Sequence, residues 1–561
     1  MVSIKKLSPL LLVILLSLFA LTPFFQPGFF SMHDNTQVER VSEITNSIKD
    51  GMFPVRWVLN LGFGYGYPIF NFYGPFPYYY ASFFAFFFNV LIATKIMIAS
   101  AIMLSGIFMY LLAKEFWGKK GAILSALLFV FAPYHAVNTY VRGAIGELWA
   151  YAFLPLVFYG IWKSYKEKKW KYVVIGSLGF AGLTASHNLS AFMITPFILA
   201  LIMFLFFYSD QKQKIYIGLV FLLGLLISGF YWLPAILEMG YTNVRSQVGG
   251  GADFRDHYVC ISQLWNSPWG FGGSAKGCLD GLSLKIGKIH VAFAILSLIT
   301  ALILYLKTKK INKQIIAIVI GFVGLFFSIF LTLKESSFIW EIFKPMEYIQ
   351  YPWRFLTLIS FFISFIAGFI LFFVNKVKKI KLIENSLLFL FLFVILLFNT
   401  KLFAPQFSEI KAVGFYTNTE HISWETSKIS SEYMPVDFIK PSSKDKIQKS
   451  KITIIRGSGT FNIKENKANK LTVGFNSNQD TLVHANIAFF PAWKLYVDGA
   501  LKEYQKTNSG LEFKLKEGKH LVEFKFEQTL IEKIGNILSF SGLIILILGI
   551  IYSYKRNEKA S

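Results

Sequence analysis

Charged residues are scarce in this chain, and their scarcity argues against a soluble protein. Only 16% of the 561 residues are charged, whereas 54% are hydrophobic, and soluble domains are about 25% charged. Apolar runs of about 18–20 residues recur along the chain, each long enough to cross a hydrocarbon core of ~30 Å as a helix. The composition therefore predicts a polytopic membrane protein.

Polar–apolar alternation is absent from these runs, so we expect spanning helices and not a membrane barrel. Acidic residues are also few, because 56 Lys and Arg stand against 32 Asp and Glu, a net charge of +24. The Lys residues cluster in short loops between apolar runs, where they orient a membrane protein. The charge thus predicts orientation in a bilayer and no nucleic-acid partner.

Loop charge also gives the expected topology. With Lys5 and Lys6 in the cytoplasm, every Lys-rich short loop falls on that side. The apolar segment 78–93 is expected to dip into the membrane without crossing it, since a crossing would move the later Lys clusters outside. No small-residue cleavage pattern follows the first run, so we expect an uncleaved span. We place about twelve spans near 7–25, 96–113, 121–138, 147–162, 172–187, 190–208, 215–233, 289–306, 314–332, 354–374, 384–400 and 534–553.

The external segments are then 26–77, 138–147, 231–288, 332–354 and 401–533. The latter half of the last one alternates in period two, as in Leu511–Leu515 and Leu521–Phe526, with turn residues between. This pattern predicts a small antiparallel β-sandwich. The expected organisation is a transmembrane domain at 1–400, an extracytoplasmic β-rich domain at 401–533, and a final helix with a cytoplasmic tail at 534–561.

Cysteine is nearly absent. Cys260 and Cys278 are the two in the chain, and both lie in the external segment 231–288. An extracytoplasmic loop makes a disulfide plausible. Two free thiols are the alternative, because sequence does not supply the geometry of a bridge.

The first external segment begins with His33-Asp34 and continues as an amphipathic helix. Thr36 and Glu39 match a capping box, and apolar residues then recur at helical spacing up to Asp50-Gly51. We expect this helix to lie on the outer membrane surface. Asp34 would sit near the headgroups, where a general base for a lipid-linked substrate is needed. The alternative is an Asp that caps or anchors the helix.

A Gly- and Pro-rich aromatic stretch follows from 53 to 75 and contains Arg56 and Tyr67. Its rings could stack on sugars, which makes His33, Arg56 and Tyr67 candidate substrate-binding residues. They could equally belong to the aromatic belt at the membrane interface.

Several motifs occur in a specific order: HDNTQVER, GMFPVRW, GYGYPIFNFYGPFPYYY, RGAIGELWAYAFLP, SHNLS, WLPAILE and QYPWRFL. In this the chain resembles the bacterial membrane proteins called 6-pyruvoyl-tetrahydropterin synthase-related, relatives of YfhO-type proteins and of the GT-C glycosyltransferase superfamily. The pterin name itself implies nothing here, since no zinc-binding synthase domain is evident.

The GT-C resemblance implies roles for two acidic residues. An aspartate of the first external loop acts as catalytic base in GT-C enzymes, and Asp34 matches that position. A second acidic residue near the donor or a metal is matched by Glu147. Asp34 and Glu147 are therefore the candidate ligands of a divalent metal such as Mg or Mn. The acidic pair of some oligosaccharyltransferases is missing, which puts metal dependence in doubt.

Four further polar residues lie at outer helix ends and are candidate substrate-binding residues: Arg142, His187, Glu238 and Arg354. Arg binds phosphate oxygens in two-pronged fashion, yet Arg at a helix end also snorkels for structural reasons. Both readings stay open for each arginine. His187 and Glu238 are candidates because ionisable residues near apolar spans are often functional, but at the rim they escape much of the burial cost.

The expected function is an inverting GT-C-type transferase in the cytoplasmic membrane, with its active site facing outward. It would move a sugar from a polyprenyl-phosphate donor to an envelope glycan, lipid or protein. One alternative is a transporter or flippase of lipid-linked glycans, which predicts charges in the middle of spans. Another is a noncatalytic envelope scaffold, for which Asp34 would not matter.

Overall fold

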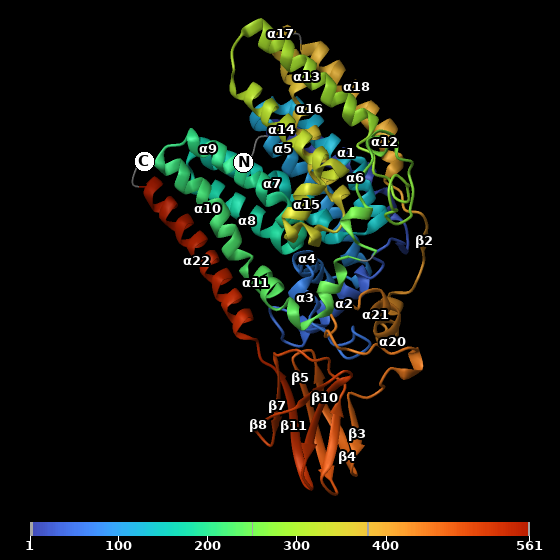
Figure 1. Cartoon of the computed structure of the whole chain (residues 1–561). Coiled ribbons are helices and arrows are strands. Elements are labelled where there is room, and N and C mark those ends of the chain that lie inside the picture. The colour runs from blue at the N-terminus through green and yellow to red at the C-terminus, as the bar shows by residue number, and fades with distance from the viewer. Residues whose placement is uncertain (1–3, 250, 379–380, 559–561) are drawn as a thin grey trace.

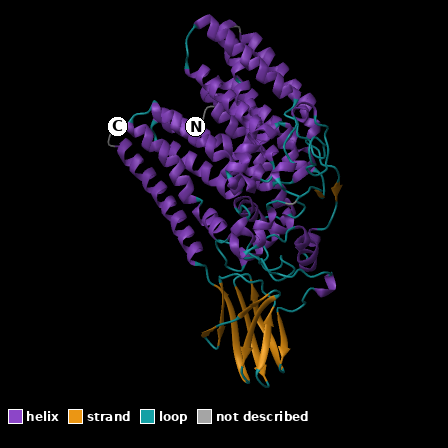
Figure 2. Cartoon of the chain, in the orientation of Figure 1, coloured by secondary structure: helices purple, strands orange, loops and turns teal. Residues whose placement is uncertain are grey.

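The computed structural model describes residues 4–249, 251–378 and 381–558 (Figure 1). Packed helices form one large body, and all the long strands gather in a β-sandwich at one end of it (Figure 2). The last helix, α22 (Leu530–Glu558), starts at the sandwich and runs back along α10 and α11. The expected fold class, a helical membrane protein with a β-domain before the last helix, is confirmed.

The long helices follow the apolar runs of the sequence. They are α1 (Ile4–Ser17), α5 (Val90–Val130), α7 (Ile145–Glu167), α8 (Trp170–Ser186), α9 (Asn188–Phe207), α10 (Gln211–Ile227), α11 (Gly229–Leu237), α13 (Lys288–Thr308), α14 (Lys313–Thr332), α16 (Leu356–Ala367), α17 (Phe369–Lys378), α18 (Lys381–Asn399) and α22.

The expected count of twelve spans is not confirmed. Eight of the described helices are long and apolar enough to cross a bilayer, or nine if the pair α10–α11, bent by 65°, is one span. The difference has local causes. Two expected spans fall in α5, which is continuous except for a break at Gly118 (φ +73°), and α8 has only 17 residues. The helix over the first expected span is interrupted after Ser17 by a 3-10 stretch, Leu18–Phe25.

The segment expected to dip without crossing forms a short helix. This helix, α4 (Phe76–Ala85), has 10 residues, about 15 Å at 1.5 Å per residue. It is too short to cross ~30 Å of hydrocarbon, so α5 begins the next span. The sides assigned to the Lys-rich loops remain a prediction.

The sandwich consists of two antiparallel sheets. One has the order β3-β6-β10-β9 and the other β4-β5-β11-β7-β8. Their bounds are β3 Ile452–Arg456, β4 Gly459–Lys467, β5 Lys470–Ser477, β6 Thr481–Ala485, β7 Trp493–Val497, β8 Ala500–Lys502, β9 Gln505–Thr507, β10 Gly510–Leu515 and β11 Gly518–Phe526. Alternate residues point inward, and the Phe513 ring of one sheet lies 5.5 Å from the Phe524 ring of the other. The domain boundaries expected at 400 and 533 remain predictions.

The sandwich rests on the first external segment. The Trp57 ring packs edge-on against Trp493 at 5.5 Å. The backbone N–H of Ala488 donates to the Tyr65 carbonyl at 3.1 Å, and the N–H of Ala468 donates to Asp50 Oδ2 at 2.8 Å. The aromatic stretch therefore packs against the sandwich inside the protein, and this packing explains why so many large rings occur in the stretch.

Two expectations about the helix after Asp34 are wrong. Helix α2 (Gln37–Lys49) is buried on nearly all sides, including Glu39 and Arg40, and does not lie on the surface. Thr36 makes no side-chain cap, and Glu39 pairs instead with His421 at 3.1 Å. Residues beyond position 412 cover Glu39 and Arg40, and Asn60 covers Glu43, a packing that local spacing does not reveal.

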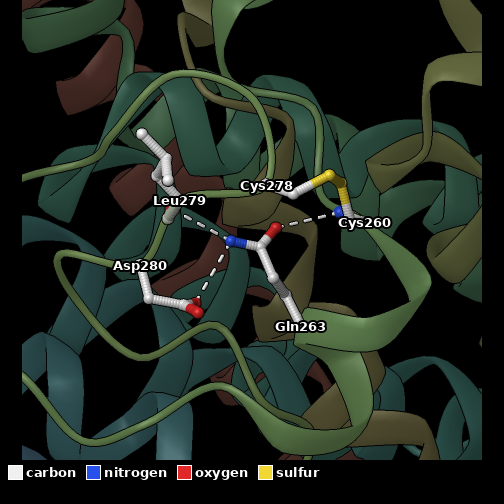
Figure 3. Close-up of a disulfide and its surroundings, with 5 residues drawn as sticks. All are labelled: Cys260, Gln263, Cys278, Leu279 and Asp280. Carbon is white, nitrogen blue, oxygen red and sulfur yellow. Dashed lines mark hydrogen bonds between the residues drawn. A yellow bond between two sulfur atoms is a disulfide. The ribbon is translucent and has the colours of Figure 1, made fainter.

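The two cysteines form the expected disulfide (Figure 3). Cys260 and Cys278 have Cα atoms 5.6 Å apart. Gln263 supports the bridge, since it accepts from the Cys260 N–H at 3.0 Å and donates to the Leu279 carbonyl at 3.1 Å. The bridge closes an external loop that has little regular structure.

Removing the disulfide should lower stability. A closed loop of this length contributes about 3 kcal/mol in the chain-entropy model. We expect Cys260→Ser/Cys278→Ser to unfold at a lower temperature in detergent, as followed by tryptophan fluorescence. Reductant should lower the melting temperature of the wild type, because Cys278 is exposed, and should leave the double variant unchanged. Equal melting temperatures for both proteins would contradict the prediction.

Candidate active site

Asp34 lies where the first two external segments meet. Its backbone N–H donates to the Arg142 carbonyl at 2.9 Å, and the His33 N–H donates to the Val141 carbonyl at 3.0 Å. These bonds fix Asp34 against the loop between α5 and α7. Burial raises the pKa of the Asp34 carboxyl above its ordinary value, and the guanidiniums of Arg40 and Arg142 offset part of that rise. A carboxylate with a raised pKa is a better proton acceptor.

Glu147 sits between two arginines. Arg142 meets it with two nitrogens, at 2.6 Å to Oε2 and 2.8 Å to Oε1. Arg354 Nε lies 2.9 Å from Oε1, an ion-pair contact without hydrogen-bond alignment. The Arg142 guanidinium also lies 4.6 Å from the Trp353 ring centre. Two guanidiniums against one carboxylate leave a net positive charge beside Asp34.

The structure thus brings together four predicted residues from three parts of the sequence: Asp34, the neighbours Arg142 and Glu147, and Arg354. His187 lies at the end of α8, and burial lowers its pKa to about 4, so its ring is neutral near pH 7. Its own ring is engaged, because Nδ1 accepts from the Ser190 N–H at 3.1 Å and so caps α9.

Arg40 is a site residue that the sequence reasoning missed. It is buried, donates to Ser430 Oγ at 2.8 Å and lies 4.4 Å from the Tyr73 ring centre. Two of its nitrogens, Nε and Nη1, have no hydrogen-bond partner among the described residues. Its presence in the same motif as Asp34 was a signal. The periodicity assigned it to a polar surface instead.

Two other candidates from the first external segment are placed elsewhere. His33 Nε2 donates to the Phe271 carbonyl at 2.9 Å. Tyr67 is fully buried, and its hydroxyl donates to the Ser430 carbonyl at 2.9 Å. These contacts join the first segment to later external segments and favour positioning roles.

Arg56 and Glu238 belong to a second buried network. Arg56 donates to Asn71 Oδ1 at 3.0 Å and to Asn536 Oδ1 at 2.8 Å. Asn71 donates to Glu532 Oε1 at 2.7 Å, and the Thr529 hydroxyl donates to Glu238. The network ties the first external segment and the end of α11 to the start of α22. Because Arg56 and Glu238 hydrogen-bond to other segments of the protein, the network favours a structural role for both.

Glu238 gives this network a pH dependence. Burial raises its pKa from 4.5 to about 7, with Glu532 adding to the rise and Arg56 opposing it. Between those values the folded protein holds a proton that the unfolded chain releases, so stability should fall as pH rises from about 4.5 to 7. We expect the melting temperature of Glu238→Gln to change less with pH over this range than that of the wild type. The exposed Glu503→Gln should keep the wild-type slope, and an unchanged slope in Glu238→Gln would contradict the assignment.

The candidate metal ligands do not form a metal site as they lie. Both Glu147 oxygens are held by guanidiniums, and positive charge beside them disfavours a divalent cation. Across the described ranges, no group of three His, Cys, Asp or Glu side chains is arranged to hold a metal ion. The donor set therefore does not fit Mg or Mn.

Residues 70–253 match the model of the 6-pyruvoyl-tetrahydropterin synthase related domain, described as a membrane protein. The resemblance drawn from the motifs is confirmed over this segment. An uncharacterized protein of Lactococcus lactis subsp. cremoris (strain MG1363) is 27% identical over 252 residues. That alignment covers 42% of this chain and 41% of the relative, so this chain matches less than half of the relative's length.

Similar solved structures include two glycosyl-transferring enzymes. Arabinofuranosyltransferase AftD from Mycobacteria has a TM-score of 0.49 and 12% identity, covering 75% of this chain and 28% of AftD. The oligosaccharyltransferase AglB of Archaeoglobus fulgidus, in complex with an inhibitory peptide and a dolichol-phosphate, has a TM-score of 0.41 and 15% identity. It covers 77% of this chain and 56% of AglB. The chain spans only part of each enzyme.

Proposed function

We propose that this protein is a membrane glycosyltransferase that moves a sugar from a polyprenyl-phosphate donor to an extracytoplasmic acceptor, with inversion. The observation that carries the proposal is the backbone pairing of Asp34 with Arg142, which sets a partly buried carboxylate beside an arginine pair. A base and a cationic phosphate site are the two parts that such a transfer needs.

Asp34 takes the proton of the acceptor hydroxyl as its oxygen attacks the anomeric carbon. The new C–O bond forms while the bond from that carbon to the phosphate oxygen breaks, and polyprenyl phosphate leaves without protonation. Arg142 and Arg354 stabilise the developing charge on the phosphate. Arg40 also acts on Asp34, and two of its nitrogens have no partner among the described residues, so its guanidinium is a further candidate for that charge.

Charge placement favours this function over a transporter. Asp34 lies outside the spans, and Arg142, Glu147, Arg354 and Glu238 lie at or beside helix ends. A transport pathway for a charged lipid-linked glycan would place such groups at the middle of the membrane.

The test is transfer by the full chain reconstituted in liposomes with a panel of polyprenyl-phosphate sugars. We expect release of free polyprenyl phosphate with one or more donors. Arg354→Gln should reduce this turnover, and Arg456→Gln, the same change at an exposed strand residue, should not. Movement of intact lipid-linked glycan across the bilayer without sugar release would overturn the proposal in favour of a flippase.

A further inference from the structure

A cavity of about 430 Å³ adjoins the candidate active site. It lies between the start of the first external segment and the segment from 409 to 429. Its walls are held together by the short pairing of β1 (Phe29–Phe30) with β2 (Ser408–Glu409). The lining residues are Phe29, Phe30, Ser31, Asn35, Glu39, Glu409, Lys411, Phe415, Tyr416, His421, Glu425, Thr426, Lys428 and Ile429.

The lining combines aromatic rings with carboxylates and leaves little cationic charge for an anion. Within the cavity wall, Lys411 pairs with Glu409 at 2.6 Å and Lys428 with Glu425 at 2.7 Å. Three glutamates against two lysines leave the lining without net positive charge, which disfavours a phosphate or another anion. Carboxylates that accept from hydroxyls, next to apolar rings, suit a neutral polyhydroxylated ligand.

A second hollow of about 380 Å³ lies next to the first. The two share Phe415, His421 and Glu425 as common walls. Pockets of this size match small ligands, and two neighbouring ones suit an elongated ligand. A chain of sugar rings has that shape and that chemistry.

The first cavity reaches the residue that directly follows the proposed base in the chain. Asn35 lines it, and Asp34 precedes Asn35 in the chain. We propose that the two cavities bind the acceptor as an oligosaccharide and present one of its hydroxyls to Asp34. This inference rests on the proposed function, because it names the acceptor class for the same site.

The test measures binding separately from transfer. The full-length protein, purified in detergent, is applied to a printed array of neutral, acidic and amino-sugar oligosaccharides. We expect the wild type to bind a subset of the glycans. Phe415→Ala and Glu425→Gln should each weaken that binding by about tenfold, the loss of one good contact. Asp34→Asn should bind as the wild type does, since it lacks only the base.

Phe461→Ala is the matched control, because Phe461 lines a separate hollow of about 470 Å³ on the sandwich. Glycan binding that depends on Phe461 and not on Phe415 or Glu425 would overturn the inference and move recognition to the sandwich. A wild type that transfers sugar but binds no glycan would also overturn it, leaving a lipid or protein acceptor. Glycan binding without transfer from any donor would instead count against the proposed function.

Discussion

Replacing Asp34 by Asn should lower sugar transfer by about 10²–10⁴-fold, the usual contribution of a general base. The amide keeps the shape of the side chain but does not accept the proton of the attacking hydroxyl. The backbone bonds that fix this position, Asp34 N–H to the Arg142 carbonyl and Thr36 N–H to the Asp34 carbonyl, do not involve the changed atoms. Folding and donor binding should therefore stay close to wild type. The measurement is single-turnover release of polyprenyl phosphate.

The pH profile gives an independent check on Asp34. The base must be ionised to act, so transfer falls as pH drops through its pKa. Because burial raises that pKa, the acidic limb should lie above the ordinary range of an aspartate. Asp480→Asn, at an exposed sandwich position, is the matched control and should keep the full rate. Wild-type turnover by Asp34→Asn would remove Asp34 as the base and leave the scaffold alternative standing.

The sequence predicted the site residues that lie at helix ends. Arg142, Glu147 and Arg354 each occur next to an apolar run, and apolar runs reliably mark helices. Positive-inside loops then place all three on one side of the membrane. Asp34 and Glu147 were proposed through the resemblance to GT-C transferases, and Arg142 and Arg354 from their places at outer helix ends. The packing that brings the other three to Asp34 was not predicted.

The long-range contacts of α2 could not be predicted from the sequence. The partners of Glu39 and Arg40 are His421 and Ser430, almost 400 positions later in an irregular segment. Nothing in the spacing of α2 encodes those partners, so its charged residues were assigned to an exposed face. The same segment forms one wall of both cavities, and no motif in it marks a binding site.

Glu147 should matter for stability as much as for activity. Its carboxylate is 4% exposed and faces two guanidiniums that are each 11% exposed. Glu147→Ala leaves both cations without their partner in a poorly solvated place, and breaking a buried pair in this way costs about 3–5 kcal/mol. We expect a large fall in melting temperature in detergent. Glu465→Gln, which breaks more exposed pairs with Lys467 and Lys470, should leave the melting temperature close to that of the wild type.

A triple replacement separates the two roles of this cluster. Arg142→Met/Glu147→Leu/Arg354→Met removes the charges together, so no ion is left unpaired, and apolar substitutes of similar size are often neutral for stability. The triple variant should therefore melt nearer the wild type than Glu147→Ala does, yet show no transfer because the phosphate site is gone. If the triple variant kept its transfer activity, the arginines would be structural only. If it were less stable than Glu147→Ala, the unpaired cations would not explain the loss in the single variant.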